Sequence, residues 1–436
     1  MKWSYLPPLM VYLAAGVQGM TGIVGTFYVK EHLDLSAEFL AALGFWAGIP
    51  WALKMPLGHL VDILWKFKSG LVVLGACLIA ASLLIMAQLI QSPDAMRNFM
   101  SLGAWYVLAT LLAPIGYVLQ DAVADAMTTE AIPRFKSNGE SHSEDDIHAM
   151  HVTMQTLGRV AFVGGTIFVA LLNLWVFSDS NNWMESEKKT MYRDVYLYAL
   201  IIPALSISGL ILAKWAKARE IKRLIDSGLS FQSAEGLLNP VAPQISPNQA
   251  LLYGSLLFVV FTVSIGLSEL TYGQEMIFIG SLLIVTFLMR KITSALDIES
   301  QKVLFGTAIV IFCFRATPSA GPGVNWWSID VLGFDQLFFS WLALIGSVLS
   351  LIGMYVLRAR MAKHSIIVLT LWLTLAGAVL SIPQLAMSYG FHQWASEQTN
   401  GLINARFIAI IDTALESPLG QIAMIPLLTW IAQSAP

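Results

Sequence analysis

Residues 114–130 read PIGYVLQDAVADAMTTE and close a run of apolar residues long enough to cross a bilayer. Two aspartates, Asp121 and Asp125, stand four residues apart in this run and therefore share one face of a helix. An ionisable group inside a membrane span costs roughly 2.5–3.5 kcal/mol on insertion scales, so it is kept where it faces a bundle interior or an aqueous path. This segment is therefore the first candidate for a transport site.

The chain around it is strongly apolar. Its 436 residues are 56% hydrophobic and only 12% charged, about half the charged fraction of a soluble domain. Apolar runs recur from end to end, which predicts an all-α polytopic membrane protein of about 12 transmembrane helices. The first run lacks a cleavage signal and is expected to be a retained span. The candidate spans lie near residues 6–29, 37–63, 70–91, 102–127, 148–177, 194–216, 250–269, 275–290, 303–317, 337–357, 366–388 and 405–432.

Lysine and arginine predict the orientation, because these residues concentrate in cytoplasmic loops. If the N-terminus is cytoplasmic, the inside segments hold 16 of the 25 basic residues and the outside segments hold 6, with 3 inside spans. We therefore expect an integral protein of the plasma (inner) membrane with both ends in the cytoplasm.

A basic and polar segment at residues 217–249 follows the first six candidate spans. Six spans, a cytoplasmic linker and further spans are the layout of a major facilitator, which is built from two pseudo-symmetric halves. We expect an N-terminal six-helix bundle at 1–216, the linker at 217–249, an inserted helical hairpin at 250–300 and a C-terminal bundle at 301–436.

Other functional classes find little support in the sequence. A net charge of −3 does not indicate a nucleic-acid partner. Cys77 and Cys313 lie far apart in apolar runs, so neither a disulfide framework nor a zinc site is expected. Phosphate-binding glycine loops and nucleophile elbows are absent from the sequence. We expect no enzyme activity, no cofactor and no metal.

The segment 58–68, GHLVDILWKFK, joins the second and third candidate spans. It resembles the loop signature of major facilitators, in which glycine, aspartate and basic residues latch the two halves together. The corresponding residues are Gly58, Asp62 and Lys66, with the glycine expected to let helices approach closely. An ordinary charged turn is the alternative interpretation.

Longer stretches resemble the folate–biopterin transporter family, and the most specific of them is the Asp-x-x-Ala-Asp-Ala core with its downstream Glu130. The resemblance covers most of spans two, four and five and much of the C-terminal half. The matching stretches are GIPWALKMPLGHLVD (48–62), QDAVADAMTTEAIPRF (120–135), MQTLGRVAFVGG (154–165), VLGFDQLFFSWLALIGSVLSLIGMYVLR (331–358) and IDTALESPLGQIAMIPLLTWIAQSAP (411–436).

This resemblance implies uptake of folates or related pterins by alternating access, coupled to protons. The implied partners are a small anionic substrate, protons and the lipid bilayer. Two departures stand out: the runs at 250–290 have no counterpart in a plain six-plus-six plan, and the family pattern continues into two further helices after WIAQSAP. A facilitator for another organic anion, or a non-transporting membrane delivery or assembly factor, are the alternatives.

Substrate-binding candidates are basic or amide side chains inside spans. Lys54 suits an anionic substrate, and equally an ion pair with Asp121 and Asp125. Arg159 continues a polar stripe with Gln155, and its guanidinium suits a carboxylate of the substrate or of a neighbouring helix. Gln18 lies in a glycine repeat of the first span, where helix packing is the main expectation.

Proton-coupling or gating candidates are carboxylates inside spans. Asp121 and Asp125 form the first pair. Asp412 and Glu416, also four residues apart, form a second pair in the C-terminal half.

Overall fold

The computed structural model describes residues 5–33, 35–130, 143–226, 228, 230–238, 247–268, 270–294, 296–316, 321–361 and 366–422. Across these ranges all regular secondary structure is helical, so the expected all-α fold class is confirmed. The helices are α1 Leu6–Val17, α2 Gly22–Tyr28, α3 Ala37–Ala52, α4 Lys54–Ile63, α5 Lys68–Gln91, α6 Pro93–Arg97, α7 Leu102–Glu130, α8 Glu144–Val176, α9 Glu185–Tyr198, α10 Ile201–Asp226, α11 Phe231–Leu238, α12 Gln249–Gly266, α13 Gly273–Thr293, α14 Ile298–Arg315, α15 Gly321–Asp330, α16 Gln336–Met361, α17 Ile366–Leu380, α18 Ile382–Ser388, α19 Phe391–Gln398 and α20 Ala405–Ile422.

Nine helices in the described ranges are long and apolar enough to cross a membrane, or ten if the bent pair α3–α4 counts as one span. They correspond to ten of the twelve expected spans, and the chain is a polytopic membrane protein. The expected span at 303–317 forms helix α14, which is not among these nine. The expected span at 405–432 is described only as far as Ile422, in α20.

The N-terminal helices share one tightly packed core. Apolar side chains of α5, α8, α9 and α10 meet in it with α1, α2 and α7. Ile79, Phe177, Tyr192 and Ile202 have no exposed surface at all. Burying an apolar side chain of this size contributes about 1.5–3 kcal/mol relative to leaving it in water, so this core fixes the positions of the N-terminal helices.

Two glycine crossings bring helices of this core into backbone contact. A Cβ atom on Gly16 of α1 would lie 2.0 Å from the carbonyl oxygen of Phe162, and one on Gly165 of α8 would lie 2.6 Å from that of Leu13. Gly75 of α5 and Gly116 of α7 form the second crossing, with Cβ positions 2.7 and 2.6 Å from the opposite glycine's carbonyl oxygen. Only glycine permits this approach.

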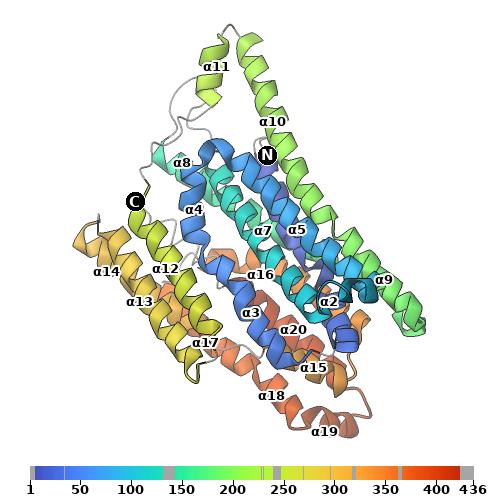
Figure 1. The fold of residues 1–436 in the computed structure, drawn as a ribbon. Helices are drawn as coiled ribbons and strands as arrows, with labels where there is room; N and C mark the ends of the chain where they lie inside the picture. The colour runs from blue at the N-terminus through green and yellow to red at the C-terminus, as the bar shows by residue number, and fades with distance from the viewer. Residues whose placement is uncertain are drawn as a thin grey trace.

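Helices α12 and α13 pack as an antiparallel pair beside α3 and α4 (Figure 1). Leu288 fills the space at Gly254, and the ring of Phe261 lies over Gly280. The backbone N–H of Asn248, just before α12, donates to Nε2 of His59 on α4 at 2.9 Å. The pair therefore rests on the N-terminal helices at a place set by α4.

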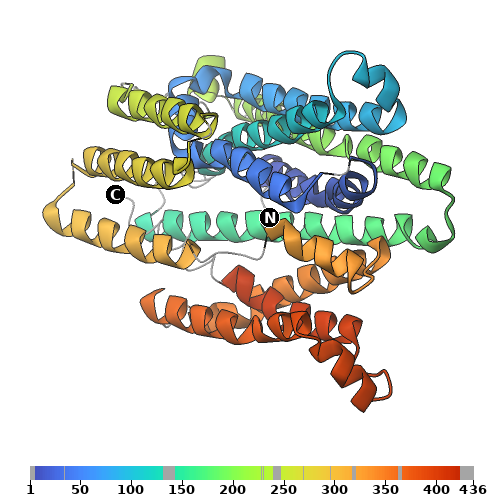
Figure 2. The ribbon, with the colours of Figure 1, turned by 60° about the horizontal axis from the view of Figure 1, so that its bottom comes forward.

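The C-terminal helices meet the N-terminal ones along α8. Helix α16 packs against both α8 and α20, and Figure 2 shows α8 between the blue N-terminal helices and the orange and red C-terminal helices. Contact between α16 and α20 is close, because a Cβ on Gly353 would lie 2.7 Å from the ring of Pro418. The α8–α16–α20 junction is thus the seam between the two groups of helices.

At the end of the bundle near Lys30, here termed the Lys30 end, polar contacts join the two groups of helices. Nζ of Lys30 lies 2.7 Å from Oδ2 of Asp330, the last residue of α15. Nε2 of Gln336 on α16 donates to the hydroxyl of Tyr192 on α9 at 2.8 Å. The opposite end, where the α4–α5 turn carries Lys66, is termed the Lys66 end.

Candidate functional site

Lys54 lies at a break between α3 and α4. Pro56 has no N–H to donate to the carbonyl of Ala52, so the helical hydrogen-bond ladder is interrupted at Leu53. The two segments meet at an angle of 41°. The break places the Lys54 side chain against α7.

The ammonium of Lys54 bridges both aspartates of α7. Its Nζ lies 2.5 Å from Oδ2 of Asp121 and 2.9 Å from Oδ2 of Asp125. The hydroxyl of Tyr12, on α1, donates to Oδ1 of Asp125 at 2.6 Å. Three helical segments thus meet at one acidic cluster, defined here as Tyr12, Lys54, Asp121 and Asp125.

The sequence placed the two carboxylates on one face, and the structure agrees. Of the two interpretations of Lys54, contact with Asp121 and Asp125 is the one present in this structure. With both carboxylates ionised the acidic cluster carries a net charge of −1, and one proton makes it neutral. Asp121 is the most enclosed member, with 17% of its side chain exposed, against 41% for Lys54 and 43% for Asp125.

Tyr12 and Gln120 are contributors that the sequence did not reveal. Tyr12 is a single polar residue in an apolar run, 113 positions from its partner, so no local pattern marks it. Gln120 is buried, donates to the carbonyl of Val72 at 3.2 Å and accepts from the hydroxyl of Ser206 at 2.8 Å. These bonds fix α7 against α5 and α10, and with it the orientation of the neighbouring Asp121.

Arg159 lies on α8, next to the residue that makes room for Tyr12. A Cβ on Gly158 would come within 3.0 Å of the Tyr12 ring, so the glycine permits the close contact of α1 and α8. The guanidinium carbon of Arg159 lies 5.2 Å from the ring centroid of Phe162, one turn further along α8. The side chain of Gln155, the other member of its predicted stripe, lies outside the described residues.

The glycines of the repeat in the first span have different surroundings. Gly16 makes a tight helix crossing, as expected, whereas at Gly19 and Gly22 a Cβ would meet no atom of the described residues within 4 Å, so the expected packing is not seen there. Gln18 begins a short 3-10 turn, Gln18–Thr21, that separates α1 from α2. Gln18 is half-buried, beside the open space at Gly19.

Asp412 and Glu416 lie on α20 as expected, with different surroundings. Oδ1 of Asp412 is buried and finds no hydrogen-bond partner within the part of the chain that the structure describes. Glu416 is exposed. An unpartnered buried carboxylate oxygen is costly and calls for a proton or a ligand.

The predicted latch does not show the expected close approach at its glycine. A Cβ on Gly58 would meet no described atom within 4 Å, so the described residues provide no close neighbour for this glycine. Asp62 is half-buried and Lys66 is exposed. The contact found on this part of α4 is instead that of His59 with Asn248.

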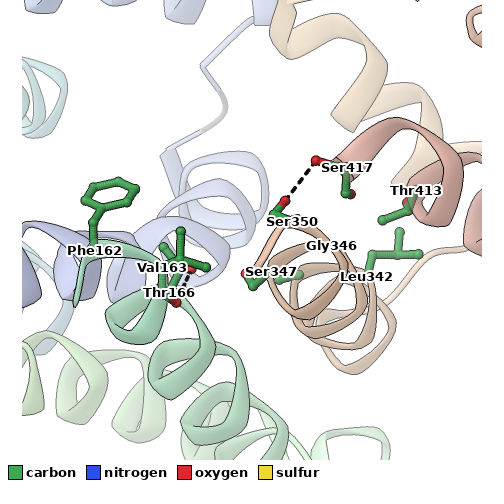
Figure 3. Close-up of a pocket in the computed structure, with 10 residues that line it drawn as sticks. Phe162, Val163, Thr166, Leu342, Gly346, Ser347, Ser350, Thr413 and Ser417 are labelled. Atoms are coloured by element: carbon green, nitrogen blue, oxygen red, sulfur yellow. Dashed lines mark hydrogen bonds between the residues drawn. The ribbon is translucent and has the colours of Figure 1, made fainter. Parts of the chain in front are cut away.

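A cavity of about 320 Å³ lies at the seam between α8, α16 and α20. Figure 3 shows Thr166 of α8 and Ser347 of α16 turned toward the space between their helices, and the hydroxyl of Ser350 bonded to the carbonyl of Ser417 at 2.9 Å. Phe162 and Thr413 also line it, and all its lining residues are uncharged. None of the residues singled out from the sequence is among them.

Fold and site together define a polytopic helical membrane protein with a partly exposed acidic cluster and a polar cavity between two groups of helices. Over its whole length the chain is similar to a curated protein, the folate-biopterin transporter of Synechocystis sp. (strain ATCC 27184 / PCC 6803 / Kazusa), with 20% identity over 439 residues covering 69% of that protein. The resemblance drawn from the motifs is therefore confirmed, and the expected class is a transporter rather than an enzyme. No protein-family model matches the chain.

Three solved structures of transporters align with most of this chain at TM-scores below 0.5. A D-xylose-proton symporter is 9% identical with a TM-score of 0.44, covering 98% of this chain and 80% of its own. A POT family transporter in complex with 5-aminolevulinic acid is 13% identical with a TM-score of 0.45, and the match covers 99% of this chain and 90% of that transporter. Another POT family transporter structure, with a thioalcohol-conjugated peptide, is 12% identical with a TM-score of 0.42 and the same coverage.

Proposed function

We propose that this protein carries a folate- or pterin-like anion across the membrane by alternating access, coupled to protons. The observation that carries the proposal is the acidic cluster, three charges held between α1, α4 and α7 of a membrane-spanning bundle. The similarity to a folate-biopterin transporter supports the class of cargo. The bundles at 1–216 and 301–436 are the moving halves, with the hairpin 250–300 between them.

The acidic cluster supplies a simple coupling mechanism. When both carboxylates are ionised, Lys54 is occupied by Asp121 and Asp125. A proton on either carboxylate leaves the ammonium paired with only one ionised partner, so that it can also attract a carboxylate of the cargo. Because linkage is reciprocal, cargo bound at Lys54 also favours the proton. Arg159, Gln18 and Gln155 would complete the anion site, and Asp412 and Glu416 would serve the proton path in the other half.

The membrane potential sets a demand on this coupling. Moving one charge through 100 mV is worth about 2.3 kcal/mol, so a cargo with two carboxylates meets about 4.6 kcal/mol of opposition entering a negative interior. Two protons cancel that opposition and a third makes the voltage drive uptake. The direction is inward across the plasma (inner) membrane, with a cytoplasmic N-terminus, which the distribution of lysine and arginine supports.

The test is uptake of radiolabelled folate and of neutral pterin into proteoliposomes, with and without an inward proton gradient. We expect folate to accumulate with the gradient and to equilibrate without it. Gradient-driven uptake of another organic anion with no folate signal would identify a different cargo. No transport of any anion tested would instead favour a membrane delivery or assembly factor.

A further inference from the structure

We infer that the cavity between α8, α16 and α20 binds the heteroaromatic ring of the cargo, while the charged residues near the Lys66 end hold its carboxylates. This inference rests on the proposed function and assigns a second subsite to the same cargo. The cavity is walled by α8 on one side and by α16 and α20 on the other. Its occupant therefore touches both groups of helices.

The hydroxyl groups of the cavity are only partly used by the protein. The hydroxyl of Thr166 donates to the carbonyl of Val163 in its own helix at 2.8 Å, and that of Ser350 donates to Ser417. Within the described part of the chain, the hydroxyls of Ser347, Thr413 and Ser417 have no hydrogen-bond partner. Each offers one donor and two acceptor lone pairs to an occupant.

These uncharged hydroxyl groups favour the binding of a neutral, polar part of the ligand. Burying an ionised carboxylate among uncharged side chains is unfavourable, so the anionic part of the cargo is excluded from the cavity. A flat fused-ring heterocycle with carbonyl, amino and ring-nitrogen groups along its edge matches hydroxyls that both donate and accept. The volume is near the lower end of the range for small-molecule pockets, roughly 300–1,000 Å³, and suits one ring system better than a whole folate.

The position of Arg159 links this cavity to a carboxylate site. Residues 159, 162, 163 and 166 follow the spacing of one helix face, and the last three line the cavity. A helix rises 1.5 Å per residue, so Arg159 lies about 10 Å from Thr166 along α8, toward the Lys66 end. When the ring of the cargo occupies the cavity, its carboxylate tail can extend along α8 toward the guanidinium of Arg159.

The two halves of folate, pterin and p-aminobenzoylglutamate, test this division when each is bound to the full-length protein in nanodiscs. The ring-site variant is the triple substitution Ser347→Ala, Thr413→Val and Ser417→Ala. Two to three lost hydrogen bonds predict a pterin affinity lower by about tenfold to a hundredfold. The affinity for p-aminobenzoylglutamate is expected to stay unchanged.

Two further variants keep the result interpretable. Ser340→Ala is the matched control, because Ser340 is on α16 but is fully buried and bonds to its own helix at Gln336. Ala343→Trp fills the cavity while leaving every hydroxyl in place, and it is expected to abolish pterin binding. Size-exclusion profiles of all variants report whether the fold is kept.

Two outcomes overturn the inference in different ways. If wild-type protein binds both probes and the ring-site and Ala343→Trp variants bind pterin with wild-type affinity, the cavity is not the ring site and the proposed cargo stands. Equal losses for both probes also contradict a separate ring subsite. If wild-type protein binds neither probe nor folate, the proposed cargo is wrong and the ring site falls with it.

Discussion

The acidic cluster and the cavity are both polar regions inside an apolar bundle, but they differ in how their polar groups are satisfied. In the acidic cluster, Lys54 contacts both aspartates and Tyr12 donates to one of them. In the cavity, Ser347, Thr413 and Ser417 keep hydroxyls without partners in the described residues, and no charge is present. The polar groups of the acidic cluster are paired with one another, whereas three hydroxyls of the cavity are left without a partner among the described residues.

This difference indicates that the acidic cluster responds to protons and the cavity to an occupant. The acidic cluster responds to a change in its own protonation, because one proton changes its net charge from −1 to zero and removes one of the two ionised partners of Lys54. A cavity with unused hydroxyls responds to an occupant that supplies the missing hydrogen bonds. The α1–α8 crossing at Gly16 and Gly165 lies between them, one turn beyond Tyr12 and beside Phe162.

The largest expected effect comes from breaking the charge balance. Lys54→Met leaves two like charges unpaired within a membrane span, which we expect to lower uptake about a hundredfold and to destabilise the protein by about 1–3 kcal/mol for this half-exposed pair. Uptake into proteoliposomes and thermal unfolding in detergent measure the two effects. Lys222→Ala, an exposed lysine on α10, is the control.

A neutral triple variant separates stability from transport. Lys54→Met with Asp121→Asn and Asp125→Asn removes all three charges, so the unfolding temperature should return close to that of the wild type. Coupled uptake should remain lost. Recovery of gradient-driven uptake in this variant would show that the acidic cluster is structural only.

The stability of the protein should be sensitive to substitution at Gly16, in the α1–α8 crossing, and tolerant of substitution at Gly19. Gly16→Ala places a methyl group against the carbonyl of Phe162, so the helices must separate, at a cost of about 1–3 kcal/mol in unfolding free energy. Gly19→Ala adds a methyl group where no atom of the described part of the chain lies within 4 Å. Thermal unfolding of the two variants side by side checks this, and equal shifts would contradict the tight crossing.

A smaller effect is expected from removing a single hydroxyl of the acidic cluster. Tyr12→Phe deletes one hydrogen bond to a carboxylate, worth about 1.5–3 kcal/mol at most, and should reduce coupled uptake severalfold without abolishing it. Tyr117→Phe on α7 is the control, since its hydroxyl has no bond to another described residue. A change of the same size in both variants would remove Tyr12 from the mechanism.

The smallest effect belongs to the ion pair at the Lys30 end. Lys30 and Asp330 are 18% and 57% exposed, and pairs of this kind contribute about 0.2–1 kcal/mol. A double-mutant cycle with Lys30→Ala and Asp330→Ala should give a coupling energy in that range. A coupling energy of zero would mean that the pair does not stabilise the contact between the two groups of helices at this end.

The sequence predicted those features that depend on local pattern. Apolar runs gave the spans, and the four-residue spacing of Asp121 and Asp125 placed both on the face that meets Lys54. It did not predict α14 as a helix that falls short of a candidate span, since apolar character alone marked the run at 303–317. Boundaries inside spans, such as the 3-10 turn at Gln18–Thr21, were also missed.

Features assembled from distant segments were beyond the sequence. Serine and threonine are common in membrane helices, so nothing distinguished Ser347 or Thr413 before α16 and α20 met α8. Gly16 and Gly19 look alike in a repeat, yet one faces a neighbouring backbone and the other open space. Whether a glycine is needed depends on which helix crosses it, and that is a tertiary property.

The central claim is that proton binding at the acidic cluster is coupled to cargo movement. Its most direct test records acidification inside proteoliposomes when folate is added outside, using an internal pH dye and no imposed gradient. Wild-type protein should acidify the interior on addition of folate, and the neutral triple variant of Lys54, Asp121 and Asp125 should not. Folate entry without acidification in the wild type, or equal acidification in the variant, would contradict the claim.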